Sequence, residues 1–155
     1  MKLNEEFLSQ RGSSWDDPTL HLEHKYIQLH DRALFVEKIR RFLLRCAGEK
    51  PLVIKEPRIT VLADYWFEAA QAAGMEVKIV ISVRHPNEII ASVVARDKIS
   101  VELASTLYTI YSLLAERNSR NYARVFVGYE NLLHNWRQEM NTGVKVIFLR
   151  DAVSE

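Results

Sequence analysis

The sequence contains one cysteine, Cys46, among its 155 residues. A single thiol cannot form an intramolecular disulfide, and it supplies neither a redox pair nor the paired thiolates of a structural zinc site. An excess of basic charge is also absent, because 21 Lys and Arg residues face 20 Asp and Glu residues. The resulting formal net charge of +1 excludes the basic balance typical of a dedicated nucleic-acid binder. We therefore expect any anion-binding site to be local.

Long apolar segments are missing as well. No uninterrupted apolar run approaches the roughly 20 residues that a membrane span requires. The first ten residues do not place an apolar stretch behind a basic one, as a secretory signal would. Together with the single thiol, these features predict a cytoplasmic protein with no membrane partner.

Glycine and proline are scarce, with five and four residues. The glycines lie at positions 12, 48, 74, 128 and 143, so no two are close enough to form a glycine-rich phosphate-binding loop. No repeat, low-complexity tract or Ser/Gly linker divides the sequence, and 48% of its residues are hydrophobic. We predict one globular domain over residues 1–155.

Helical and strand-like apolar patterns alternate along the chain. Apolar residues at intervals of three and four predict helices over residues 1–10, 31–46, 59–73, 87–95, 100–117 and 130–140. Short β-branched runs predict strands over residues 51–54, 77–83, 124–129 and 144–149. The strongest of these, 77–83, is predicted to be central and buried. Because helices connect the strands, we expect an α/β fold with a parallel sheet of three to four strands flanked by helices.

Three polar side chains lie at the carboxyl ends of predicted strands, namely Lys55, Arg84 and Tyr129. Ligands of parallel α/β sheets bind at the carboxyl ends of the strands, so we expect these side chains around one crevice. Arg84 also precedes a turn and a helix that contains Ser92. A phosphate at this place could bind the guanidinium, the Ser92 hydroxyl and the amides of the first helical turn.

Each of these residues also has an ordinary structural interpretation. Arg84 could pair with a surface carboxylate, and Ser92 could be an unremarkable polar residue on a helix. Lys55 could be a solvent-exposed lysine at a strand end. Tyr129 could be a core aromatic residue with its hydroxyl at the surface.

Taken together, the segments resemble sulfotransferases that use 3′-phosphoadenosine 5′-phosphosulfate (PAPS). Residues 83–92 are similar to the segment that binds the 3′-phosphate of the donor, in which an arginine ends a strand and a serine follows eight positions later. Residues 54–58 resemble the Lys-Asp-Pro element of bacterial and tyrosylprotein-type members, whose lysine lies near the transferring sulfuryl group. Residues 124–133 resemble a Val-x-Tyr-Glu-Asp-Leu segment whose tyrosine approaches the adenine, with Asn131 in place of the aspartate.

The resemblance spans roughly residues 1–138 and implies both a fold and an activity. The implied activity is transfer of a sulfuryl group from PAPS to a hydroxyl acceptor, with PAPS or 3′,5′-adenosine bisphosphate as the bound nucleotide and no metal. Lys55 is then the catalytic residue. The nucleotide-binding residues are then Arg84, Ser92 and Tyr129. The implied fold is a sulfotransferase core related to that of P-loop NTPases.

Members of the family begin with a strand and a loop that surrounds the 5′-phosphosulfate, and this sequence has no such loop. We therefore expect an N-terminally truncated member whose core lacks its first strand and loop. A homodimer could complete such a sheet, because exposed strand edges pair with other chains. Two alternatives to an active enzyme remain open: a noncatalytic nucleotide-binding or assembly module, and an inactive truncated remnant.

Two further motifs are weaker. Residues 12–18 resemble a Gly-Gly-Ser-Trp-Asp-Pro segment of bacterial members, which indicates an acceptor-side loop, although Trp15 is equally suited to anchor a core. His21 and His24 are three residues apart, but no further ligand is clustered with them in the sequence. We predict no metal site on this basis.

Overall fold

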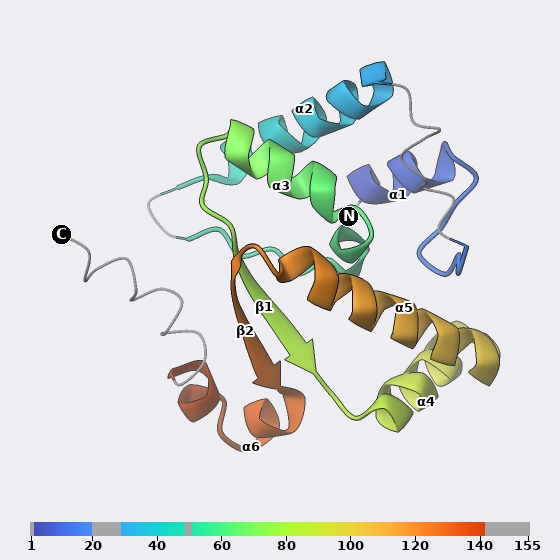
Figure 1. Cartoon of the computed structure of the whole chain (residues 1–155). Coiled ribbons are helices and arrows are strands. Elements are labelled where there is room, and N and C mark those ends of the chain that lie inside the picture. The colour runs from blue at the N-terminus through green and yellow to red at the C-terminus, as the bar shows by residue number, and fades with distance from the viewer. Residues whose placement is uncertain (1, 20–28, 49–50, 142–155) are drawn as a thin grey trace. The chain divides into compact units, whose positions relative to one another are not determined.

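The computed structural model describes residues 2–19, 29–48 and 51–141. The chain divides into two compact units, Met1–Val77 and Lys78–Glu155. The described residues form six α-helices, one short 3₁₀ helix and a two-stranded parallel sheet, which makes the fold mixed α/β and rich in helix (Figure 1).

All regular secondary structure described in the first unit is helical. Its elements are α1 (Lys2–Ser9), α2 (Leu29–Cys46), the 3₁₀ helix η2 (Pro57–Thr60) and α3 (Ala63–Ala72). Helices α2 and α3 pack against each other. Two of these helices end near a glycine in the left-handed region, at Gly12 (φ 65°) and Gly74 (φ 70°), where a side chain would be strained.

Aromatic rings form the centre of the first unit. The rings of Phe7 and Phe35 stack with centroids 3.7 Å apart, and Tyr65 meets each of them edge-on. The indole nitrogen of Trp66 donates a hydrogen bond of 3.0 Å to the buried side-chain oxygen of Asn4. The apolar faces predicted from the sequence therefore converge on one aromatic core.

The second unit contains the sheet. Its elements are β1 (Lys78–Val83), α4 (Pro86–Asp97), α5 (Val101–Ser119), β2 (Ala123–Gly128) and α6 (Tyr129–Glu139). The strands pair in parallel, with Lys78 opposite Ala123 and Val83 opposite Gly128. Helix α5 carries the chain back between them, and the two strands therefore end at the same edge of the sheet (Figure 1).

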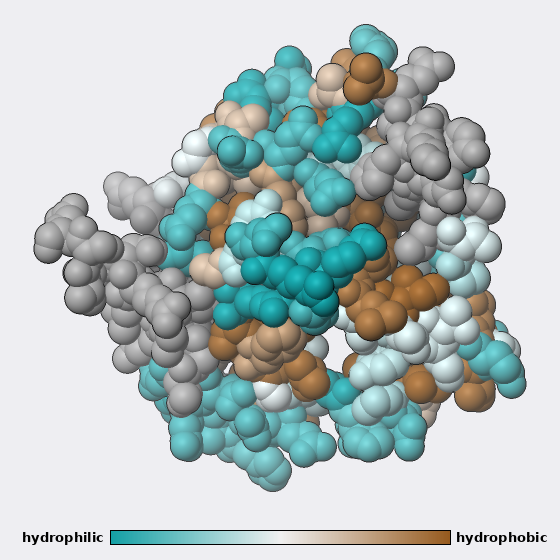
Figure 2. Space-filling view, in the orientation of Figure 1, coloured by the Kyte–Doolittle hydropathy of each residue, from teal (hydrophilic) through white to brown (hydrophobic). Residues whose placement is uncertain are grey.

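Few side chains are buried in the second unit. Among its described apolar residues only Ala104, Leu107 and Val127 are buried. Large apolar side chains of both strands remain about half exposed, among them Val80 (49%) and Phe126 (50%). Apolar residues accordingly reach the molecular surface between polar ones (Figure 2).

Two predictions about the sheet are wrong. Residues 51–54 form no strand, and instead Ile54 packs against the core of the first unit. A β-branched run becomes a strand only where a partner strand is available, and Pro51 has no N–H to donate to one. The strand β1 is also not buried, because the described part of the chain supplies one neighbour, β2, where a central strand would have two. The strand predicted over 144–149 lies outside the described residues.

The helices and β strands at other positions are confirmed, with ends shifted by one to a few residues. Pro86 occupies the first turn of α4, as predicted from its fixed φ and missing N–H. In the described ranges, no helix combines the length and the hydropathy that crossing a membrane requires.

Candidate functional site

The carboxyl ends of the two strands bring Arg84 and Tyr129 together. Val83 and Gly128 are register partners at the last position of the sheet, and the two polar residues follow them directly. The guanidinium carbon of Arg84 lies 4.7 Å from the centroid of the Tyr129 ring, within the range of a cation–π contact. The parallel pairing predicted from the sequence therefore explains why residues 45 positions apart are neighbours.

Arg84 also pairs with a carboxylate of the helix that follows it, α4. Its Nε donates to Glu88 Oε2 over 2.7 Å, and the two side chains are 32% and 46% exposed. This is the surface pairing that the structural interpretation of Arg84 anticipates. Such exposed i,i+4 pairs contribute little net stability, so an anion with more negative charge can replace the carboxylate at low cost.

Ser92 lies on the same side of α4 as the carboxylate. It is exposed and follows Glu88 by four residues, and residues four apart are neighbours on a helix face. Glu88 and Ser92 are therefore neighbours on α4, and the ion pair places Arg84 beside Glu88. An anion that contacted both Arg84 and Ser92 would occupy the position of the Glu88 carboxylate.

The amides at the start of α4 have partners within the chain. His85 caps the helix, and its Nδ1 accepts a hydrogen bond of 3.3 Å from the Asn87 N–H. The N–H groups of Glu88 and Ile89 donate to the His85 carbonyl at 3.1 and 3.2 Å. The prediction that these amides are open to a phosphate is wrong, because the sequence pattern did not reveal the capping role of His85. An anion at this place would depend on side chains.

A second carboxylate, that of Glu139, binds the residues on either side of Tyr129 in the sequence. Glu139 Oε1 accepts the Gly128 N–H over 2.8 Å, and its Oε2 accepts the Asn131 side-chain amide over 3.1 Å. Helix α6 is kinked at Asn135 (φ −154°, ψ 77°), which turns its last residues back towards its start. An aspartate at position 131 could not donate this hydrogen bond, so the asparagine found there matches the carboxylate of Glu139.

Lys55 belongs to the first unit. Its side chain is exposed, and it stands between Ile54, which packs on the core, and Glu56, which caps η2. Glu56 is held by Arg58, whose Nε donates over 2.7 Å. Burial raises the pKa of the Glu56 carboxyl, but hydrogen bonds, those from Arg58 among them, outweigh it and leave this pKa below its ordinary value. Lys55 thus extends from a backbone segment fixed on both sides.

The remaining motifs are local. Residues 12–18 form the predicted turn, in which Ser13 Oγ donates to Asp17 Oδ2 over 2.8 Å. The Trp15 side chain is half-buried. His21 and His24 lie outside the described residues, and within the described ranges no three His, Cys, Asp or Glu side chains gather as metal ligands would.

The sequence thus predicted that Arg84 and Tyr129 are neighbours. It did not predict the contacts that Glu88, His85 and Glu139 make at this site. Glu88 could have been found, because a carboxylate four residues after an arginine predicts an ion pair where a helix begins.

Comparison of the chain with protein-family models, with curated proteins and with solved structures finds no significant match to any of them.

Proposed function

We propose that this chain is a sulfotransferase-like protein whose second unit binds the 3′-phosphate and the adenine of PAPS or of 3′,5′-adenosine bisphosphate. The observation that carries the proposal is the contact of Arg84 with Tyr129 beyond the ends of two parallel strands. A guanidinium and an aromatic face side by side offer an ion-pair partner for a phosphate and a stacking surface for a base.

The donor set suits an anion. Arg84 already holds one carboxylate at 2.7 Å, and the dianionic form of a phosphate monoester would be the stronger partner. In the proposed complex the phosphate displaces Glu88, accepts from the Nε and terminal N–H groups of Arg84, and accepts the Ser92 hydroxyl. Tyr129 then packs against the base.

In the enzyme hypothesis PAPS supplies the sulfuryl group, and Lys55 supplies a positive charge. Negative charge grows on the leaving phosphate oxygen as the bond to sulfur breaks, and a nearby ammonium group stabilises it. The exposed side chain and the fixed backbone of residues 54–56 suit such a role. A nucleotide-binding module without transfer activity is the second candidate, because the Arg84–Tyr129 contact serves binding by itself.

Calorimetric titration tests the binding half. We expect the protein to bind 3′,5′-adenosine bisphosphate, and Arg84→Ala to weaken this by about 1.5–3 kcal/mol, which is about 10- to 150-fold. Adenosine 5′-monophosphate lacks the 3′-phosphate, so its weaker binding should not change in the variant. Arg117→Ala, at an exposed position of α5, is the matched control and should bind as the unchanged protein does. Absence of binding at millimolar nucleotide, or equal losses for both nucleotides, would refute the proposal.

Transfer of radiolabelled sulfate from PAPS to a panel of hydroxyl acceptors separates the two candidates. For an enzyme, Lys55→Ala abolishes transfer and leaves the affinity for the bisphosphate unchanged. Binding without any transfer favours the module. If Lys55→Ala weakens binding as much as transfer, Lys55 is a binding or structural residue.

A further inference from the structure

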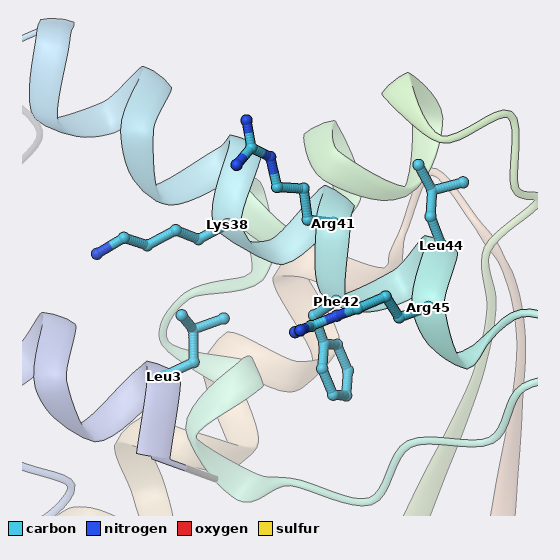
Figure 3. A pocket seen from close by; sticks show the side chains of 6 residues that line it. All are labelled: Leu3, Lys38, Arg41, Phe42, Leu44 and Arg45. Atoms are coloured by element: carbon cyan, nitrogen blue, oxygen red, sulfur yellow. The ribbon is translucent and has the colours of Figure 1, made fainter.

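A hollow between α1 and α2 of the first unit has a distinctive lining. Its volume is about 490 Å³, and its walls are Leu3, Lys38, Arg41, Phe42, Leu44 and Arg45 (Figure 3). Three of these side chains are apolar and three are cationic, and none is acidic. The volume lies within the range of ordinary small-ligand pockets.

The three cations lie along one helix face and are unequally neutralised. Arg41 follows Lys38 by three residues and precedes Arg45 by four, which makes them neighbours on α2. Arg41 Nε donates to Glu37 over 2.8 Å, and Glu37 is shared with Arg40. In the part of the chain that the structure describes, the side chains of Lys38 and Arg45 have no ion pair. The hollow therefore carries uncompensated positive charge.

The apolar part of the lining is anchored in the core. Leu3 and Phe42 both pack against the buried cluster of the first unit, and the Phe42 ring meets Trp66 edge-on with centroids 6.0 Å apart. This surface is held in place without a ligand, which reduces the entropy cost of binding. Leu44 is exposed, and its side chain points away from Leu3 and Phe42 (Figure 3).

A neighbouring hollow provides an internal comparison. It has a volume of about 230 Å³ and shares Leu3 and Lys38 with the first. Its lining also contains Glu6 and Asp31, so its positive charges are balanced by negative ones. A lining that combines cationic and apolar side chains without an acidic one therefore distinguishes the larger hollow from its neighbour.

We propose that the larger hollow is a binding site for a small amphipathic anion, a carboxylate attached to an apolar body. The carboxylate binds Arg41 together with Lys38 or Arg45, and the apolar body lies on Leu3 and Phe42. Charge complementarity selects an anion over a neutral molecule, and the apolar wall selects an organic anion over an inorganic one. The site belongs to the first unit and is independent of the nucleotide proposed for the second.

Calorimetric titration with octanoate, octanol and acetate tests the site. Octanoate carries both features, octanol lacks the charge and acetate lacks the apolar body, so we expect octanoate to bind at least about tenfold more tightly than either. The double variant Lys38→Gln/Arg45→Gln should lose about tenfold in octanoate affinity. Leu3→Ser, at a partly exposed position of the lining, should weaken octanoate several-fold.

The matched control changes the same net charge elsewhere. Arg96→Gln/Arg117→Gln removes two exposed cations from α4 and α5 and should leave octanoate binding unchanged. No heat from octanoate at millimolar concentration overturns the proposal. So does equal binding of octanol, or an equal loss in the control variant, since either result means that the cations of the hollow do not select the ligand.

Discussion

The two units of this chain differ in what holds them together. In the first unit a cluster of buried apolar side chains joins three helices, and its members are Phe7, Leu8, Phe35, Val36, Ile39, Leu43, Leu62, Tyr65, Trp66, Ala69 and Ala70. In the second unit few apolar side chains are buried, and polar contacts link its elements. Arg124 of β2, for example, donates to the Glu116 carbonyl and to Ser119 Oγ of α5 over 2.9 and 3.0 Å.

The candidate nucleotide site lies in the unit that buries fewer apolar side chains. The candidate nucleotide site, with Arg84 and Tyr129, is built where the core is thin and the side chains are accessible. Regions with few buried apolar contacts open at a smaller free-energy cost than packed cores do. The stabilisation that a ligand adds depends on its concentration and Kd, so it is a larger fraction of the unfolding free energy in a unit with few buried apolar contacts.

The largest expected effect comes from truncating one aliphatic side chain in each unit. Ile39 is fully buried, and Ile39→Ala should lower the free energy of unfolding by about 2–5 kcal/mol because it leaves a cavity. Leu113 is 65% exposed, and Leu113→Ala should change the free energy of unfolding by no more than about 0.5 kcal/mol. Urea unfolding followed by circular dichroism measures both. Equal losses would show that the second unit depends on apolar packing as much as the first.

Much of the fold could be predicted because it depends on local pattern. Apolar residues at intervals of three and four fix α2 and α5 whatever surrounds them, and the β-branched runs of β1 and β2 fix two strands. Residues 51–54 have the same composition, but strand formation needs a partner, and the sequence does not state which strands pair. Exposure of β1 likewise follows from the number of neighbouring strands, which no local pattern encodes.

The site could be predicted only in part for a similar reason. Two parallel strands end at one edge, so the meeting of Arg84 and Tyr129 follows from topology. The contact of Glu139 with Gly128 depends on a kink at Asn135, and nothing in the sequence pattern marks that backbone change. His85 as a helix cap was missed because histidine is not among the usual capping residues.

A smaller effect is expected from removing the carboxylate that occupies Arg84. Glu88→Gln takes away a negative charge that competes with the phosphate, so the affinity for 3′,5′-adenosine bisphosphate should rise by up to about fivefold, the range of an exposed ion pair. Glu102→Gln, at the exposed first turn of α5, is the control for the change in net charge. Calorimetric titration of both variants measures the difference. Weaker binding in Glu88→Gln would contradict this expectation. It would mean that Glu88 positions Arg84 for the ligand and belongs to the binding site.

Each unit contains a carboxylate that is shared by two arginines. Removing this carboxylate should have the smallest effect of the changes considered. Hydrogen bonds from Arg40 and Arg41 lower the pKa of Glu37 to about 2 from 4.5, and a hydrogen bond from Arg120 together with one from Arg124 lowers the pKa of Glu116. A folded-state pKa below the unfolded value stabilises the protein above about pH 4.5, and for Glu37 this contribution disappears as the pH falls towards about 2.

Glu37→Gln and Glu116→Gln test whether the two carboxylates contribute equally to the stability of their units. Both carboxylates are more than one-third exposed, so solvent screens them and each variant should unfold at only slightly lower urea concentration at pH 7. The difference from the unchanged protein should shrink for both on acidification. Glu37 joins residues of one helix, whereas Glu116 joins α5 to β2 through Arg124, so Glu116→Gln should have the larger effect. Equal effects would mean that this polar link does not compensate for the thin core of the second unit.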